Sequence, residues 1–387
     1  MRMNDASKQC RGKVCVLTTV HMPFDGRIFH RGARSLAKAG YDVTLIARHT
    51  KEEIVGGVRV LPLPQAKNRL QRVTKVMRRL YRLAVRENAD VYHFHDPELM
   101  IVGLLLKVRG KKVIWDAHEH YPNSILDKYY ISKPLRWLTS RSFDLFERVV
   151  IRFFDYVLYT TPLVGARYAT MKVRAGRVEN YPIVELSKAP PRQPQEKIIY
   201  LGGMSKIRGL LEVVEALAEV VQKHPRWKLC LVGSFSPASF EGEVRDLVKK
   251  LGVEANVEFI AWVPYDEKEK LSSQASMGVI TYLPYSNNTS CLPNKLFDYM
   301  LVSLPVIASN FPLYREVVEG SHCGLIVDPS KPREIARAME YLIENPDEAR
   351  RMGDNGRRAV LEKYNWETES KELLRIYDEV LGKQRGN

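Results

Sequence analysis

Short runs of apolar residues alternate with amphipathic segments along almost the whole chain. In the first half, the apolar runs predict strands at Lys13–Leu17, Asp42–Ala47, Val91–Phe94, Lys112–Trp115 and Tyr156–Tyr159. Between them, apolar positions at helical spacing predict helices at Ile28–Ala39 and Asn68–Arg86. Strands that are apolar almost throughout and are separated by helices are typical of a parallel sheet covered on both faces.

A proline-rich segment, Ser187–Glu196 (SKAPPRQPQE), interrupts this alternation and is interpreted as a linker. The alternation then restarts, with strands predicted at Ile198–Leu201, Lys228–Val232, Val257–Ile260, Met277–Thr281, Pro305–Ala308 and Gly324–Val327. Further helices are predicted at Leu210–Val221 and Glu367–Leu381. The pattern therefore predicts two α/β units in tandem.

The length of 387 residues suits two domains, because single cores rarely grow to this size. We expect a first Rossmann-like domain over residues 1–186, a linker over 187–197 and a second Rossmann-like domain over 198–366. The C-terminal helix, within residues 367–387, is expected to pack back on the first domain. Apolar residues make up 45% and charged residues 27% of the chain, as in folded globular proteins.

The five cysteines are scattered and form no CxxC pair, which favours a reducing compartment over a disulfide framework or a zinc site. The basic N-terminus has no apolar stretch suited to a signal peptide, and no run approaches the roughly 18 apolar residues of a membrane-spanning helix. We therefore expect a cytoplasmic protein, with peripheral attachment to the inner face of the cell membrane as an option.

The positive charge of the chain is confined to its first half. Residues 1–185 contain 33 basic and 17 acidic residues, whereas the remainder is nearly neutral. The two densest segments are Lys67–Arg86, with apolar residues interleaved at helical spacing, and Lys133–Phe154, which adds aromatic residues. Each segment is interpreted as a solvated helix face or as a surface for anionic membrane lipids. No nucleic-acid-binding motif accompanies the charge, so a nucleic acid partner is not expected.

Three loops after predicted strands carry candidate chemistry. Thr18–Arg27 (TTVHMPFDGR) opens a helix whose N-terminus attracts anions, but it lacks GxGxxG and also fits a simple turn. In Tyr200–Gly209 (YLGGMSKIRG), Gly202 and Gly203 permit close backbone approach. Lys206 and Arg208 place cations where a diphosphate would lie.

The third loop leads into a predicted helix start in Asn287–Met300 (NNTSCLPNKLFDYM). Backbone N–H groups near Pro293, together with Asn294 and Lys295, are candidates for binding phosphate oxygens. Asp298, one turn further, is a candidate for hydrogen bonds with a ribose diol. The alternative is that Asp298 and Lys295 are solvated residues on a helix surface.

Four histidines follow predicted strands, His93 and His95 in YHFHDPE and His118 and His120 in DAHEHYP. The carboxyl ends of strands are where open α/β sheets place their sites. The HExxH spacing is absent, so we expect no metal site. For His93 and His120 we favour a structural role.

These motifs, in this order and across essentially the whole chain, resemble glycosyltransferase family 4, whose members are retaining enzymes with the GT-B fold. The most specific stretch is PNKLFDYMLVSLPVIASNFP. Three further stretches are similar to the family: RGARSLAKAGYDVTLIA, YLGGMSKIRGLLEVVEAL and YNWETESKELLRIYDEVL. The resemblance implies an α/β fold with two Rossmann-like domains facing each other across a cleft.

The resemblance also implies roles for individual residues. His118 matches the family histidine near the donor sugar, and Arg208 lies where a lysine usually pairs with the donor phosphates. Asp298 lies where a glutamate holds the nucleotide ribose. The acceptor side would comprise Asp25, Gly26, Arg27 and His95.

Two positions depart from the family pattern. Ser290 stands where an acid is expected eight positions before Asp298, and Gly203 replaces an arginine often found beside the phosphates. We hypothesise that Lys295 supplies the missing positive charge.

These observations predict a metal-independent, cofactor-free transferase, and the resemblance implies that it acts with retention of configuration. The expected donor is a UDP- or GDP-sugar, and the expected acceptor is the hydroxyl of a lipid-linked or other membrane-borne glycan. Two alternatives stay open: a nucleotide-sugar epimerase of the same fold, and a non-catalytic protein that binds nucleic acid or an anionic surface.

Overall fold

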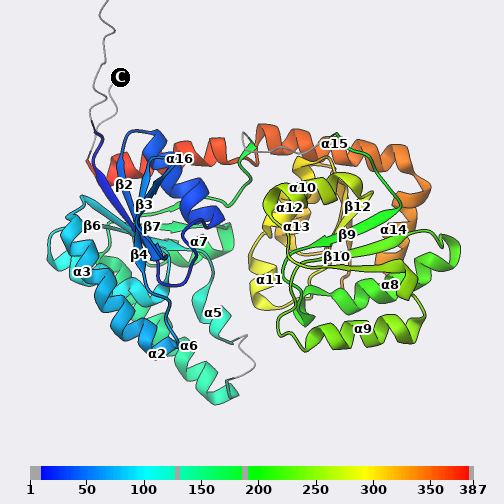
Figure 1. Ribbon diagram of the computed structural model, residues 1–387, viewed down its shortest axis with the longest axis horizontal. Helices are drawn as coiled ribbons and strands as arrows, with labels where there is room; N and C mark the ends of the chain where they lie inside the picture. Colours follow the sequence, from blue (N-terminus) through cyan, green and yellow to red (C-terminus); the bar gives the residue numbers. More distant parts are fainter. Residues whose placement is uncertain (1–9, 127–130, 185–190, 383–387) are drawn as a thin grey trace, which may run out of the picture. The chain divides into compact units, whose positions relative to one another are not determined.

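The computed structural model describes residues 10–126, 131–184 and 191–382 (Figure 1). The chain divides into two units, of which the first comprises residues 1–180 and 367–387 and the second residues 181–366. The first part of the expected linker, residues 187–190, lies outside the described residues.

The first unit is built on an eight-stranded sheet with the strand order β3-β4-β2-β1-β5-β6-β7-β8. The strands are β1 (Lys13–Leu17), β2 (Asp42–Arg48), β3 (Glu53–Val55), β4 (Val58–Leu63), β5 (Val91–Phe94), β6 (Lys112–Ala117), β7 (Tyr156–Tyr159) and β8 (Ala175–Arg177). All neighbouring pairs are parallel except β3 and β4. The five strands predicted from the sequence therefore form the expected parallel sheet, and the antiparallel pair is an addition at its edge. There Gly56 and Gly57, both at positive φ, allow a tight hairpin turn.

The expected helices of the first half are present, although each is made of several pieces. Ile28–Ala39 corresponds to η1 (Gly26–Ala33) and α1 (Arg34–Lys38), and Asn68–Arg86 to α2 (Arg69–Gln71), η2 (Arg72–Val76) and α3 (Met77–Glu87). The remaining helical segments are η3 (Pro97–Leu99), α4 (Met100–Val108), α5 (Tyr121–Leu126), α6 (Lys133–Val150), η4 (Ile151–Phe153) and α7 (Pro162–Ala169). In α3 the basic residues are exposed, whereas Leu80 and Ala84 are buried, so this segment is amphipathic as expected.

The last helix, α16 (Trp366–Val380), adds buried residues to the first unit. The Tyr377 hydroxyl lies 2.9 Å from Nδ1 of His93, a residue of the central strand β5. Asp378 accepts hydrogen bonds from Arg11 at 2.6 Å and from the Tyr41 hydroxyl at 3.0 Å. A segment from the end of the sequence thus completes the core of the first unit.

The second unit contains a fully parallel six-stranded sheet with the order β11-β10-β9-β12-β13-β14. Its strands are β9 (Lys197–Leu201), β10 (Lys228–Val232), β11 (Val257–Ile260), β12 (Met277–Ile280), β13 (Val306–Ser309) and β14 (Gly324–Val327). The helical segments are η6 (Lys206–Arg208), α8 (Leu210–Lys223), α9 (Phe240–Leu251), η7 (Glu254–Asn256), α10 (Tyr265–Gln274), α11 (Ser286–Ser290), α12 (Asn294–Leu301), α13 (Pro312–Val318), α14 (Pro332–Glu344) and α15 (Pro346–Glu362). Every strand predicted for this half is found within one residue of its expected bounds.

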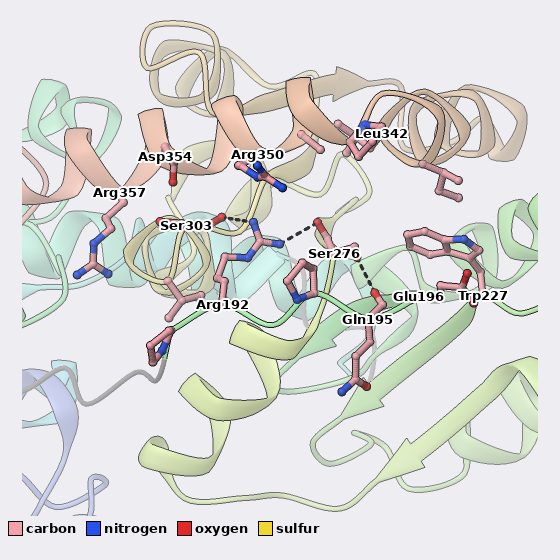
Figure 2. A pocket seen from close by; sticks show the side chains of 16 residues that line it. Arg192, Gln195, Glu196, Trp227, Ser276, Ser303, Leu342, Arg350, Asp354 and Arg357 are labelled. Carbon is pink, nitrogen blue, oxygen red and sulfur yellow. Dashed lines mark hydrogen bonds between the residues drawn. The ribbon is translucent and has the colours of Figure 1, made fainter.

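A cavity of about 890 Å³ lies beside the segment that leads into β9 (Figure 2). Within it, Arg192 donates hydrogen bonds to the carbonyl oxygens of Ser303, at 2.6 Å, and Ala275, at 2.9 Å. The cavity lies at the amino ends of β9 and β12, whereas open α/β sheets bind ligands at the carboxyl ends of their strands. We therefore assign Arg192 a structural role, in which it fastens the connecting segment to the second unit.

Candidate functional site

Each sheet has a central point at which the order of its parallel strands reverses direction. In the first unit this point lies between β1 and β5, and in the second between β9 and β12. The loops that follow such a pair of strands diverge to opposite faces, which leaves a crevice where ligands bind. The three sequence-predicted loops follow strands at these points, and His95 and His118 directly follow β5 and β6.

In the first unit, the loop after β1 is held by two carboxylates. Asp25 caps the following helix by accepting hydrogen bonds from the backbone N–H groups of Arg27 and Ile28, at 2.8 and 2.9 Å. Asp96, after β5, accepts hydrogen bonds from the Thr18 hydroxyl at 3.0 Å and the Thr19 backbone N–H at 2.5 Å. The loop is therefore fixed in place by both strands of the reversal point.

His21 lies between these carboxylates, with Nδ1 3.4 Å from Asp25 and Nε2 3.7 Å from Asp96. Its hydrogen bond with Asp25 raises the pKa of His21, an effect that burial opposes. Burial also works to raise the pKa of Asp25, but the His21 hydrogen bond and the capped N–H groups lower it below its usual value. His21 was not among the candidates from the sequence, although it lies in the predicted loop.

The centre of the first site is the buried carboxylate of Asp116, the penultimate residue of β6. Arg27 donates to both of its oxygens, at 2.8 and 3.0 Å, and also to the carbonyl oxygen of Val178. Nitrogens of His93, His95 and His118 lie 3.5, 3.2 and 3.7 Å from one carboxylate oxygen. Although burial opposes it, the Arg27 guanidinium keeps the pKa of Asp116 well below its usual value.

His118 is brought into position by this network. Its Nε2 lies 2.9 Å from Nδ1 of His95, whose pKa burial lowers well below the usual value. His118 is about 20% exposed, whereas His95 is buried. His93 is also buried and contacts Tyr377, and the Nδ1 of His120 accepts a hydrogen bond from the Asn123 backbone at 3.3 Å. Of the four histidines, His118 thus combines contact with the network and access to solvent.

The potential ligand atoms of His93, His95 and Asp116 all lie within 4.8 Å of one another, close enough to hold a metal ion. Arg27, however, occupies both oxygens of Asp116 with its own positive charge. A cation placed here would lie beside a buried guanidinium and would compete with it for the carboxylate. The arrangement therefore favours a hydrogen-bonded network over a metal centre.

In the second unit, the loops after β9 and β12 are in direct contact. The backbone N–H of Leu283 donates to the carbonyl oxygen of Ile207 at 3.0 Å, and the buried Asn288 side chain donates to carbonyl oxygens of both loops. At Gly209, with φ of +70°, a Cβ atom would lie 1.9 Å from the carbonyl oxygen of Thr281. Glycine is therefore required for this close approach.

Two cations lie on aromatic faces at this reversal point. The Arg208 guanidinium is centred 4.2 Å from the Tyr282 ring, and Lys295 Nζ lies 3.6 Å from the Tyr200 ring. Lys295 Nζ is buried and has no hydrogen-bond partner among the described residues. Burial, and then the nearby Arg208, lower the pKa of Lys295 well below its usual value. The described residues thus leave the Lys295 amine without a hydrogen-bond partner and close to the cationic Arg208.

The other residues predicted to bind the nucleotide-sugar donor differ in their exposure and in their distance from Lys295 and Arg208. Gly202 lies against Lys295, since a Cβ atom there would be 3.6 Å from its Nζ, whereas nothing lies within 4 Å of the equivalent atom at Gly203. Lys206 is exposed and pairs with Glu243 at 3.4 Å. Pro293 precedes α12, where Asn294 is exposed and the half-buried Asp298 lies one turn further along. Ser290 ends α11 and is also half-buried.

Sequence reasoning missed the aromatic platform of Tyr200 and Tyr282 and the central carboxylate Asp116. A signal existed for Asp116, because an acidic residue inside an otherwise apolar strand needs a buried partner. The tyrosines gave no such signal, since aromatic residues in buried strands usually serve the core.

Two family models match the chain. The model described as a glycosyl transferase 4-like domain matches residues 26–182, and the model described as glycosyl transferases group 1 matches residues 185–359. A curated relative, the phosphatidyl-myo-inositol mannosyltransferase of Mycobacterium leprae, is 23% identical, with 90% of this chain and 88% of the relative covered. Matches to several other curated relatives cover only 41% to 49% of those proteins, so the chain spans about half their length.

Solved structures of similar fold cover nearly the whole chain. The sucrose-phosphate synthase of Thermosynechococcus elongatus has a TM-score of 0.80 at 18% identity and covers 96% of this chain and 100% of its own. The Anabaena protein HepE, solved with UDP-glucose, has a TM-score of 0.71 at 14% identity, covering 95% and 100%. At such identities these likenesses establish the fold alone. The two family models show that the chain belongs to the family-4-like glycosyltransferases, and the solved structures show that it has the two-domain α/β architecture of the GT-B fold.

Proposed function

We propose that the chain transfers a sugar from a nucleoside diphosphate sugar to an acceptor hydroxyl. The observation that carries this proposal is the buried Lys295 amine, which lacks a hydrogen-bond partner among the described residues and lies near Arg208. A diphosphate at this point would supply the missing negative charge. The UDP-glucose bound to the HepE protein supports a uridine nucleotide as the first donor to test.

The same cations suit the chemistry of the leaving group. Departure of a nucleoside diphosphate builds negative charge, and preorganised positive charge aimed at it lowers the barrier. In our proposal Arg208 and Lys295 do this work, so that no metal ion is needed. The transfer would retain the configuration of the sugar, as the family resemblance implies.

His118 is the proposed contact to the reacting sugar. Since its Nε2 faces His95 within the network, Nδ1 is the nitrogen left for a substrate hydroxyl. The roles of Asp25, Gly26, Arg27 and His95 on the acceptor side stay predictions. Asp25, Arg27 and His95 have hydrogen-bond partners inside the first unit. We therefore expect these three residues to position their neighbours and not to contact the acceptor directly.

We further propose that the acceptor is membrane-borne and that the first unit binds an anionic bilayer surface. The exposed cations of α3 support this, as do exposed apolar residues of α6 such as Trp137, Leu138 and Leu145. Among the described residues, no helix combines the length and hydropathy that crossing a bilayer requires. The relative named for phosphatidyl-myo-inositol, a membrane lipid, is consistent with such an acceptor.

The test is release of nucleoside diphosphate from UDP- and GDP-sugars in the presence of extracted bacterial lipids. We expect release from one donor class that depends on the lipid fraction, and a loss of about 100-fold in Arg208→Ala. Lys223→Ala, which removes an exposed cation paired with Glu340, is the matched control and should retain the wild-type rate. Release that Arg208→Ala leaves unchanged would contradict the proposal.

A further inference from the structure

A small slot in the first unit lies apart from the charged networks described above. It has a volume of about 240 Å³ and is formed by α2, η3, α4, α5 and α6. In Figure 1, α2 and α6 lie at the same end of this unit, in agreement with the residues that line the slot. Its walls are largely apolar and include Ile101, Tyr121, Ile125, Phe143 and Phe146.

The slot opens onto exposed apolar helix faces. Ile101 begins a stripe along α4 that continues through Leu105 and Val108, which are 53%, 43% and 88% exposed. Phe146 belongs to α6, where Leu145 and Val149 are also exposed. Contiguous exposed apolar surface marks a contact with another molecule or with a membrane, because leaving it in water costs free energy. The slot is thus continuous with a surface suited to lipid.

Charged groups at one rim of the slot connect it to the first reversal point. Glu98 lines the slot and accepts hydrogen bonds from the Thr19 hydroxyl, at 2.7 Å, and from Arg72. The Thr19 backbone N–H in turn donates to Asp96, which holds the loop after β1. Arg69 also lines the slot and is exposed, and its guanidinium has no hydrogen-bond or ion-pair partner among the described residues. An anion at this rim could therefore form an ion pair with the Arg69 guanidinium.

We infer that this slot binds the alkyl chain of a lipid phosphate, with the phosphate at Arg69. The slot is smaller than the roughly 300–1,000 Å³ of pockets that enclose drug-sized ligands, so it suits a length of chain and not a nucleotide sugar. An apolar interior with an unpaired cation at its rim complements a chain that ends in a phosphate. This inference rests on the proposed function, because it makes the lipid phosphate part of the acceptor and the slot its anchoring subsite.

The experiment titrates the full chain with octyl phosphate below its micelle concentration and follows binding by calorimetry. We expect saturable binding to one site, and at least tenfold weaker binding of inorganic phosphate and of octyl glucoside, each of which carries one of the two features. Arg69→Gln should weaken octyl phosphate several-fold without changing octyl glucoside. Absence of saturable binding, or equal binding of all three probes, would overturn the inference.

Two variants separate the slot from the apolar surface around it. Ile101→Asp introduces a charge into the slot at a half-exposed position and should weaken octyl phosphate at least tenfold. Val108→Asp places the same charge further along the same stripe of α4, outside the slot, and should stay within twofold of wild type. Phe146→Asp repeats the first test from α6, in case Ile101→Asp does not fold. Equal losses in Ile101→Asp and Val108→Asp would overturn the inference, because the surface as a whole would then be responsible.

The inference and the proposed function can fail separately. Nucleotide binding is measured on the same preparations by thermal unfolding with UDP and GDP. A chain that binds nucleotide but not octyl phosphate overturns the slot inference and leaves the transferase proposal standing. A chain that binds octyl phosphate but no nucleotide supports the slot and contradicts the transferase.

Discussion

At the scale of single residues, both sites contain a buried ionisable group, which has hydrogen-bond partners in the first unit and none within the described part of the second. In the first unit the Asp116 carboxylate is fully engaged by Arg27 and by neighbouring histidines. In the second unit the Lys295 amine lies on an aromatic ring and lacks a hydrogen-bond partner among the described residues. A buried ion pair with all its hydrogen bonds made stabilises the fold. A buried polar group without a partner costs free energy and is typical of a ligand-binding site.

Nucleotide binding should therefore be linked to protonation of Lys295. Burial and Arg208 lower the pKa of Lys295 in the free protein, whereas a bound diphosphate favours the charged amine and raises that pKa. We expect net proton uptake when UDP binds at mildly alkaline pH, measured by calorimetry in buffers with different ionisation enthalpies. Lys295→Met should abolish the linkage. Proton release in the wild type would contradict this assignment.

The Arg27–Asp116 pair should matter for stability more than for substrate contact. Asp116→Asn removes the charge that compensates a buried guanidinium, and we expect a loss of about 3–5 kcal/mol in the free energy of unfolding. Denaturant unfolding checks this, with Arg148→Ala as the control. Arg148 makes a more exposed pair with Asp144, and its loss should cost about 0–1 kcal/mol. Equal effects of the two substitutions would refute a buried, fully desolvated pair.

At the scale of elements, the apolar pattern predicted the central strands of both sheets well. It missed β3, β4 and β8 for identifiable reasons. β3 and β8 have only three residues each, and β4 contains Arg59 and Pro62 within its apolar run. Edge strands gain less from burial, so their sequences carry a weaker signal. The candidate loops could be found because they follow central strands, whereas partners such as Tyr282 depend on contacts between distant segments.

The turn after β9 offers a test at this scale. Gly209→Ala would force a Cβ atom against the Thr281 carbonyl in a left-handed backbone conformation. We expect a loss of more than about 1 kcal/mol in the free energy of unfolding, together with weaker nucleotide binding. Gly203→Ala is the matched control for stability, since nothing lies within 4 Å of its added atom. A neutral Gly209→Ala would mean that the two loops are less tightly apposed than described.

The cationic face of α3 gives a second element-scale prediction. Replacing Arg78, Arg79 and Arg82 with glutamate should sharply reduce sedimentation with vesicles containing phosphatidylglycerol, because each cation near an anionic surface contributes about 1 kcal/mol. Reversing one exposed charge of the second unit, in Arg351→Glu, should leave sedimentation unchanged. If the triple variant still binds vesicles, the cationic face of α3 is a solvated surface that does not contact the membrane.

At the scale of the whole molecule, the chain consists of two units of the same architectural class with unequal charge. The first unit combines the positive excess with most of the exposed large apolar residues described, and the second holds the cation pair on the aromatic platform. Sequence periodicity and charge could predict two α/β units of unequal charge. They could not predict which cation is buried or which carboxylate is shared, because these depend on packing between strands far apart in the sequence.

The central claim is that the loops after β9 and β12 bind a nucleoside diphosphate through Lys295 and Arg208. Thermal unfolding of the wild type and of Lys295→Met, each with UDP, GDP and uridine, tests it most directly. A ligand at a hundredfold over its dissociation constant stabilises the folded state by about 2.7 kcal/mol. We predict a rise of several degrees with one diphosphate, none with uridine, and none in Lys295→Met, whose own midpoint should be unchanged or higher. No shift with any diphosphate, or an equal shift in Lys295→Met, would contradict the claim.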